Sequence, residues 1–250
     1  MINPNKSLML GVIGHRGAAG HAPENTLASL AKAAELGVRW VEFDVMLTAD
    51  KAVVLFHDDK LDRITLTPGT LDETPLAVLR TLDAGAWFDA AFAGEKVPTL
   101  EEAVETLARL DLGANVEIKP SPGRETETGK AVGEALLSLW PGKLPSPVIS
   151  SFEAAALAAA RDAAPALDRA LNVFKIPRNW KKQLQQLDCS ALHCREGELT
   201  AAKARAVLDA GYCLRAFTVN DRARAKTLFG WGVEAVFSDF PDRLMYDPVP

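Results

Sequence analysis

The chain has 250 residues and a formal net charge of −5, with 48% hydrophobic and 24% charged residues. This balance is that of an ordinary soluble protein and excludes a disordered or fibrous chain, and the length suits a single α/β barrel. No basic stripe is available to neutralise nucleic-acid phosphates, so we expect no nucleic-acid partner, while a local basic cluster can still bind a small anion.

The N-terminal stretch lacks a positively charged leader followed by a long apolar run. Its apolar segment, Leu8 to Ile13, is too short for a signal core or a membrane span. The cysteines are odd in number and lack C-x-x-C spacing, so we expect reduced thiols at Cys189, Cys194 and Cys213 rather than a disulfide framework or a zinc site. These features predict a cytoplasmic protein without stable membrane insertion.

The first β-α unit runs from an apolar strand through a glycine-rich turn into a helix. We expect the strand over Leu10 to Ile13, the turn at Gly14-His15-Arg16-Gly17-Ala18 and the helix over Leu27 to Glu35. Either Asn25 or Thr26 can cap the helix. The turn places an imidazole beside a guanidinium at a strand end, which is either a solvated connection or part of a site.

The second strand carries two acids on one face. Residues Trp40 to Leu47 alternate in polarity so that Glu42 and Asp44 point the same way. The next apolar run, Ala52 to Phe56, follows after too few residues for a parallel crossover, which indicates an antiparallel hairpin. Pairing about the middle of the turn puts His57 opposite Asp44 and brings a second histidine to the acids.

Periodicity weakens from residue 58 to residue 98, where turn signals alternate with leucines and aromatic residues. Because so many aromatic residues need burial, we expect a small inserted subdomain over 58–98 rather than a linker. The sequence Thr99-x-x-Glu102 then forms a capping box that opens a helix reaching about Leu110.

The rest of the chain alternates regularly between strand and helix patterns. Expected strands are Asn115 to Lys119, Pro147 to Ser151, Arg169 to Val173, Ser190 to His193, Cys213 to Val219 and Glu234 to Ser238. Expected helices are Thr126 to Leu139, Glu153 to Ala164, Trp180 to Leu187, Thr200 to Ala210 and Asp221 to Phe229. With the two earlier strands this makes eight β-α units, which predicts one (β/α)₈ TIM barrel over 1–250, with the insertion between strand 2 and its helix. A doubly wound open sheet is the alternative.

Polar side chains gather at the carboxyl ends of the expected strands, where barrel enzymes carry their chemistry. Three carboxylates, Glu42, Asp44 and Glu117, make an oxygen-rich site suited to Mg²⁺ or Ca²⁺. Arg16 and Lys119 add positive charge that suits a phosphate ester. The histidines provide an acid and a base that titrate near neutrality. Further strand-end residues are Ser150, Ser151, His193, Thr218, Asn220 and Asp239.

This ordered set resembles the glycerophosphodiester phosphodiesterases, most closely their cytosolic bacterial type. The resemblance rests on His15-Arg16-Gly17, Pro23-Glu24-Asn25-Thr26, Glu42-x-Asp44, His57-Asp58 and Glu117-Ile118-Lys119, and it extends through Ser150-Ser151-Phe152, Thr218-Val219-Asn220 and Ser238-Asp239. A lone His-Arg-Gly would be a weak signal, whereas the ordered set is highly specific.

The resemblance implies hydrolysis of a small-molecule glycerophosphodiester, such as glycerophosphocholine or glycerophosphoethanolamine, to glycerol 3-phosphate and an alcohol. By the same resemblance His15 and His57 are the general acid-base pair, and Glu42, Asp44 and Glu117 hold a divalent cation. Arg16 binds the phosphate, and Lys119 supports the metal pocket or the phosphate. Whether the glycerol 2-hydroxyl attacks first, giving a cyclic phosphate that water opens, stays open, as does the oligomeric state.

Several residues keep two interpretations. Glu24 and Asn25 either support the helix start or contact substrate, His193 either faces the barrel mouth or lies in the core, and His21 is expected to be a solvated loop residue. Phe217 departs from the Trp or Tyr common in the family, and the basic stretch Asn172 to Trp180 fits a cationic alcohol poorly, so the head group stays open.

Two other functions compete with the leading prediction. One is a related barrel phosphodiesterase acting on lysophospholipids or sphingolipids, for which Trp87, Phe88 and Phe92 would form an apolar approach. The other is a non-catalytic barrel that binds a phosphorylated ligand, although binding alone does not need two histidines that titrate near neutrality.

Overall fold

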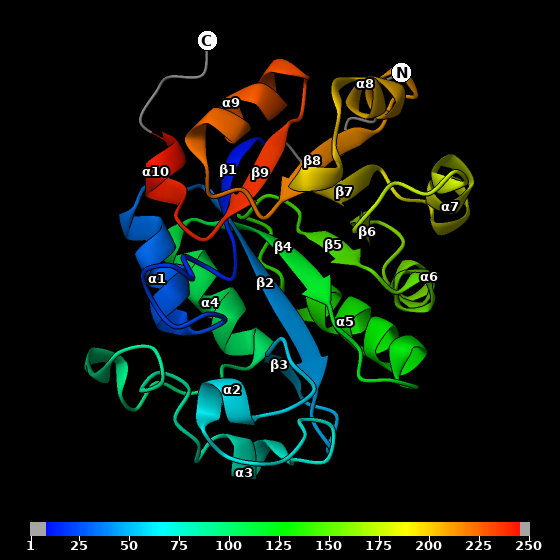
Figure 1. The fold of residues 1–250 in the computed structure, drawn as a ribbon. Helices are drawn as coiled ribbons and strands as arrows, with labels where there is room; N and C mark the ends of the chain where they lie inside the picture. Colours follow the sequence, from blue (N-terminus) through cyan, green and yellow to red (C-terminus); the bar gives the residue numbers. More distant parts are fainter. Residues whose placement is uncertain (1–8, 246–250) are drawn as a thin grey trace.

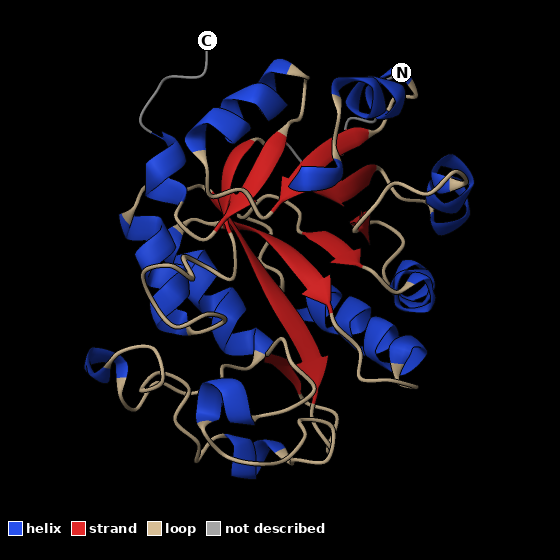
Figure 2. Ribbon diagram, in the orientation of Figure 1, coloured by secondary structure: helices blue, strands red, loops and turns tan. Residues whose placement is uncertain are grey.

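Within residues 9–245, which this computed structural model describes, eight parallel strands close into a barrel surrounded by helices (Figure 1, Figure 2). Closure is complete because β1 pairs with β9 on one side and with β2 on the other. The prediction of a TIM barrel is therefore confirmed, and Leu8 lies outside the described residues. The barrel strands are β1 (Gly11–Gly14), β2 (Trp40–Leu47), β4 (Gly113–Ile118), β5 (Val148–Ser151), β6 (Asp168–Val173), β7 (Ala191–Arg195), β8 (Cys213–Phe217) and β9 (Ala235–Ser238).

Two of the helices on the outside of the barrel, α1 and α4, begin where the sequence places their caps. The Thr26 hydroxyl accepts from the Ser29 amide at the start of α1, and Thr99 and Glu102 form the predicted capping box at the start of α4. The outer helices are α1 (Leu27–Glu35), α4 (Leu100–Leu110), α5 (Glu125–Leu139), α6 (Ala154–Ala163), α7 (Trp180–Leu187), α8 (Ala201–Asp209), α9 (Arg222–Gly230) and α10 (Pro241–Met245). A short 3₁₀ turn, η2 (Glu196–Glu198), precedes α8.

The barrel strands are buried on both faces, as parallel strands in this fold must be. All eight residues of β2 are buried. Outward side chains pack against the helices in the main hydrophobic core. A second apolar cluster, which includes the strand-start residues Trp40, Val148 and Cys213, fills the amino-terminal part of the barrel interior. Polar side chains are thus left to the carboxyl-terminal half, where the site lies.

The hairpin that follows β2 differs by one residue from the predicted register. In the antiparallel pair, Leu55 of β3 (Val53–Leu55) lies opposite Val45, and the Phe56 amide donates to the Asp44 carbonyl at 3.1 Å. The prediction that His57 lies opposite Asp44 is therefore wrong, and Phe56 takes that place. Across the turn, the Thr48 amide donates to the Ala52 carbonyl at 3.0 Å. The hairpin is therefore centred on Asp50 rather than between two residues.

β3 and β1 share one edge of β2 and leave a gap between them. Along β2, β1 pairs with Trp40 and Val41, and β3 pairs with residues 45–47. In the gap, the Gly17 amide donates to the Glu42 carbonyl at 3.0 Å. The turn after β1 and the chain after β3 therefore converge on the same stretch of β2, which brings their histidines together despite the shifted register.

The insertion expected over 58–98 lies beyond the carboxyl end of β2 and before α4 (Figure 1). It contains the short helices α2 (Asp62–Thr65) and α3 (Leu76–Leu79) and the 3₁₀ turn η1 (Ala90–Phe92). Its leucines pack with Met46 and Val54 of the hairpin into a separate apolar cluster. Across residues 9–245 none of the helices has the length and apolar character that crossing a membrane requires.

Candidate active site

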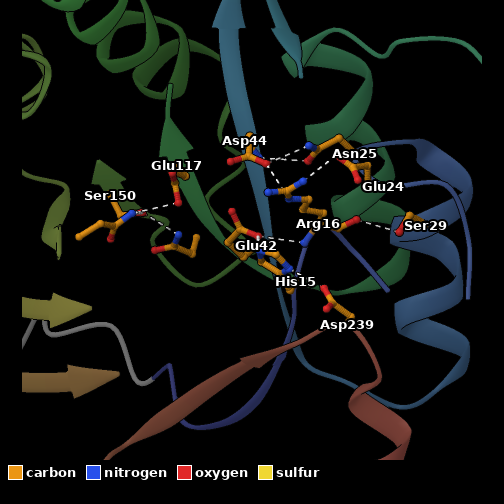
Figure 3. A network of polar contacts seen from close by, with 12 residues as sticks. His15, Arg16, Glu24, Asn25, Ser29, Glu42, Asp44, Glu117, Ser150 and Asp239 are labelled. Carbon is orange, nitrogen blue, oxygen red and sulfur yellow. Dashed lines mark hydrogen bonds and ion pairs between the residues drawn. The ribbon is translucent and has the colours of Figure 1, made fainter. Parts of the chain in front are cut away.

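Three carboxylates meet at the mouth of the barrel, from β2 and the neighbouring β4 (Figure 3). Glu42 and Asp44 share the inner face of β2, and Glu117 lies beside Asp44 in the parallel register. One oxygen from each of the three lies within 4.8 Å of the others. Glu42 and Asp44 are only 3% and 2% exposed. The predicted convergence of these acids is therefore present.

The electrostatics of the three carboxylates fit a cation. Burial, together with repulsion from Asp44, raises the pKa of Glu42 well above its usual value and that of Glu117 to about 8. Burial also opposes ionisation of Asp44, yet the charge of Arg16 beside it lowers the pKa of that carboxyl. Oxygen Oε1 of Glu42 is buried without a hydrogen-bond partner. Carboxylates that repel one another, one of them with an oxygen that accepts no hydrogen bond, could bind a hard divalent cation.

Two further side chains hold Glu117. The Asn172 amide on β6 donates to Glu117 Oε2 at 2.9 Å, and Lys119 Nζ lies 3.6 Å from Oε1. The sequence prediction placed Lys119 here and gave Asn172 no role in the site. The available signal was its position one residue before the predicted end of a strand, on the face that turns inward.

His15 is held by the turn after β1 and by an aspartate that directly follows the last strand. Glycines make the turn possible: Gly17 has φ +87°, and a Cβ on Gly14 would lie 1.9 Å from the Gly17 carbonyl oxygen. His15 Nδ1 lies 2.6 Å from Asp239 Oδ1, and the Asn220 amide donates to Asp239 Oδ2 at 2.7 Å. Figure 3 shows Asp239 beside His15. Because Nδ1 faces the aspartate, Nε2 points toward Glu42, 3.9 Å from its Oε2.

His57 is anchored in the same way by its neighbour in sequence. His57 Nδ1 lies 2.5 Å from Asp58 Oδ1. Burial lowers the pKa of His57, although Asp44 opposes this shift. Burial also disfavours the charge on Asp58, yet its hydrogen bonds with Arg63 and His57 hold the pKa of that carboxyl at about 2. An ionised aspartate accepts from Nδ1–H, which leaves Nε2 as the ring nitrogen that the aspartate does not hold in each histidine.

Arg16 lies between two carboxylates, with a left-handed backbone of φ +50°. Its Nη1 donates to Glu24 Oε1 at 2.7 Å, and its Nε lies 3.2 Å from Asp44 Oδ2, an ion pair outside hydrogen-bond geometry. Burial opposes the charge, but Asp44 and Glu24 keep the pKa of Arg16 above its usual value. The Asn25 amide donates to Asp44 Oδ2 at 2.9 Å. Glu24 and Asn25 therefore support the site, while Thr26 caps the helix.

One cavity of about 210 Å³ collects every residue that the sequence analysis assigned to the site. Its rim carries Phe152, Phe174 and Phe217, which contact one another at ring-centroid distances of 4.6 to 6.3 Å. The assigned residues on its wall are His15, Arg16, Glu42, Asp44, His57, Glu117 and Lys119. Ser150 and Ser151, also at strand ends, are buried without lining this cavity.

His21 is a partly exposed loop residue, as predicted, and it is also paired. Its Nε2 lies 2.7 Å from Asp242 Oδ1, and its ring meets the edge of Phe240 at 5.4 Å. The histidine and its partner are each partly exposed. The sequence prediction missed this contact because Asp242 lies 221 residues away in the chain.

His193 lies in the core and also faces the barrel mouth, the two environments expected for it. It is 1% exposed, lines the floor of the cavity, and lies 3.2 Å from Arg215 Nη1 through its Nε2. Burial, aided by the charge of Arg215, holds the pKa of His193 well below its usual value. The native protein therefore keeps this imidazole neutral when the unfolded chain would take up a proton.

This neutral imidazole should lower stability in mild acid. Below the unfolded pKa of about 6.5, the free energy of unfolding should fall with a slope of up to about 1.4 kcal/mol per pH unit from His193 alone. The variant His193→Gln keeps an acceptor for Arg215 but does not titrate. Urea unfolding of both proteins between pH 7.5 and 5.5 should show the shallower slope in the variant, and parallel slopes would contradict this account.

The model of the glycerophosphoryl diester phosphodiesterase family matches residues 15–243. The chain belongs to this family. Among curated relatives of this phosphodiesterase, the glycerophosphodiester phosphodiesterase of Caldanaerobacter subterraneus subsp. tengcongensis is 31% identical over 94% of this chain and 96% of its own.

Solved structures of the family show the same barrel as this phosphodiesterase. A phosphodiesterase from Oleispira antarctica, solved with the product sn-glycerol 3-phosphate, is 44% identical over 94% of both chains, with a TM-score of 0.91. The glycerophosphodiester phosphodiesterase from Agrobacterium tumefaciens is 26% identical, with a TM-score of 0.78 over 94% of this chain and 99% of its own. The predicted family and enzyme class are therefore confirmed.

Proposed function

We propose that this chain hydrolyses glycerophosphodiesters, such as glycerophosphocholine and glycerophosphoethanolamine, to sn-glycerol 3-phosphate and an alcohol. The observation that carries the proposal is the cavity that holds two anchored histidines, three carboxylates, Arg16 and Lys119 together. The Oleispira antarctica relative, solved with sn-glycerol 3-phosphate, supports the same product here.

Glu42, Asp44 and Glu117 are proposed to hold a divalent cation, Mg²⁺ or Ca²⁺. The fit rests on the three carboxylate oxygens within 4.8 Å of one another and on Oε1 of Glu42, which is buried without a hydrogen-bond partner. A bound cation supplies positive charge that neutralises the carboxylates and polarises a phosphoryl oxygen.

His15 and His57 are proposed to be the general acid and base. Each imidazole is fixed through Nδ1 by an aspartate, which leaves Nε2 to exchange a proton with the reacting oxygens. The lowered pKa of His57 keeps its Nε2 unprotonated near neutral pH, ready to accept a proton.

Arg16 and Lys119 are proposed to bind the phosphate. Both line the cavity beside the carboxylates. Arg16 is held from behind by Glu24, so its guanidinium is already oriented when substrate enters. Lys119, which also pairs with Glu117, brings a second positive charge toward the non-bridging oxygens.

The decisive test is release of glycerol 3-phosphate from a panel of water-soluble diesters with choline, ethanolamine, glycerol or inositol as the alcohol, each with Mg²⁺ or Ca²⁺. We expect turnover of at least one diester. Tight calorimetric binding of the diesters without any product would contradict hydrolysis and favour the non-catalytic barrel. The variant His15→Ala, assayed in parallel, controls for contaminating phosphodiesterases.

A lysophospholipid substrate is the second candidate, because the aromatic rim offers an apolar approach. Phe174 on this rim is 63% exposed. The residues first considered for this role, Trp87, Phe88 and Phe92, pack against one another in the inserted segment and do not line the cavity. Faster cleavage of lysophosphatidylcholine micelles than of glycerophosphocholine, with a selective loss in Phe174→Ala, would favour this substrate. Equal losses on both substrates would not.

A further inference from the structure

Arg63, on α2 of the inserted segment, connects the two halves of the proposed site. We propose that Arg63 is a positioning residue that holds His57 and Arg16 in place from outside the cavity. The inference rests on the roles given above to His57 and Arg16. It also gives the inserted segment a part in catalysis.

The first arm of Arg63 reaches His57 through Asp58. Arg63 Nε donates to Asp58 Oδ2 at 2.5 Å, while the other oxygen of Asp58 holds His57 Nδ1. The chain leaves β3 just before His57, so no strand pairing fixes the ring. The orientation of the imidazole therefore depends on a carboxylate that Arg63 itself fixes.

The second arm reaches Arg16 through Glu24. Arg63 donates from Nη1 to Glu24 Oε2 at 2.8 Å and from Nη2 to Glu24 Oε1 at 2.7 Å, which makes a bidentate ion pair. The same Oε1 accepts from Arg16 Nη1 at 2.7 Å. Glu24 is thus shared between two guanidiniums, and Arg63 balances its charge so that Arg16 is not its sole partner.

Only an arginine can make this bridge. Its planar fork presents Nε to one carboxylate and both terminal nitrogens to another, whereas a lysine ammonium offers a single point of contact. Arg63 does not itself line the cavity, and its side chain is 41% exposed. Its effect on the reaction must therefore pass through Asp58 and Glu24.

The chain offers a matched control in Arg80. This arginine also belongs to the inserted segment, is 40% exposed, and pairs with Glu102 at 2.5 Å, away from the cavity. Replacing Arg80 by alanine removes the ion pair of an equally exposed arginine of the same segment without touching Asp58 or Glu24. A loss of activity confined to the Arg63 variant would therefore not come from the segment's general stability.

The experiment measures kcat and KM for the best diester in Arg63→Ala, Arg63→Lys and Arg80→Ala. Misplacement of reacting groups costs up to about 100-fold, so we expect kcat to fall about 10- to 100-fold and KM to rise in Arg63→Ala. Arg63→Lys should recover only part of the loss, and Arg80→Ala should match the wild type. Because Arg63 is partly exposed, millimolar guanidinium should restore activity to Arg63→Ala but not to His57→Ala.

A double-mutant cycle with Asp58→Asn separates positioning from other roles. If Arg63 acts on His57 through Asp58, its removal should lower kcat less in the Asp58→Asn background than in the wild type. Additive losses, unchanged kcat and KM in Arg63→Ala, or equal losses in Arg80→Ala would each overturn the inference. Full activity in His57→Ala would instead contradict the proposed function, so the two failures are distinguishable.

Discussion

Alanine at position 15 or 57 should lower the rate of diester hydrolysis by about 10²- to 10⁴-fold, the usual contribution of a general acid or base. Each imidazole lies in the cavity beside the carboxylates and is fixed through Nδ1 by an aspartate. If the two act in one proton-transfer sequence, the double variant His15→Ala/His57→Ala should be hardly slower than either single variant. Initial rates of glycerol 3-phosphate release, with Mg²⁺ or Ca²⁺ supplied, measure the effect.

His21 provides the control for this prediction. It is also paired with an aspartate, but it lies outside the cavity that holds the other two histidines. The variant His21→Ala should keep wild-type kcat and KM, since a partly exposed ion pair contributes little to stability. Undiminished hydrolysis by His15→Ala would show that the role given to His15 is wrong.

Removal of the divalent cation should abolish hydrolysis, and Mg²⁺ or Ca²⁺ should restore it. The three carboxylates crowd together in a buried place, where burial and mutual repulsion already raise the pKa of Glu42 and Glu117. The variant Glu42→Gln removes one of these charges while keeping the shape of the side chain. We expect it to lose activity and, at pH 8 without cations, to unfold at a higher temperature than the wild type.

Thermal unfolding in the presence of cation gives a readout that does not depend on activity. Added Mg²⁺ or Ca²⁺ should raise the unfolding temperature of the wild type, because ligands that bind the native state stabilise it. The same addition should have little effect on Glu42→Gln. Full activity after exhaustive chelation, or an equal thermal shift in both proteins, would contradict the proposed cation site.

Local patterns of the sequence determined most of the fold. Alternating polarity placed Glu42 and Asp44 on one face of β2, and the capping box at Thr99 located the start of α4. Such signals are reliable because a side chain's direction in a strand and a cap's hydrogen bond depend on residues a few positions apart. The count of strand and helix segments then selected the closed barrel over an open sheet.

The hairpin shows where local patterns stop being sufficient. A turn centred on a residue rather than between two residues shifted the register, so Phe56 instead of His57 lies opposite Asp44. His57 still reaches the cavity, because β3 and the turn after β1 border the same gap along β2. Pairing in a hairpin depends on backbone conformation in the turn, and polarity alone does not specify it.

The sequence by itself determined the barrel, its helices and the set of carboxylates, histidines and basic side chains at the strand ends. Only the tertiary structure decided how these residues are held: Asp239 meets His15 across 224 positions, Arg63 bridges Asp58 and Glu24, and the aromatic rim joins three separate strand ends. The physical reason is that periodicity and capping depend on near neighbours, whereas these contacts form only when barrel closure brings distant strand ends to one mouth.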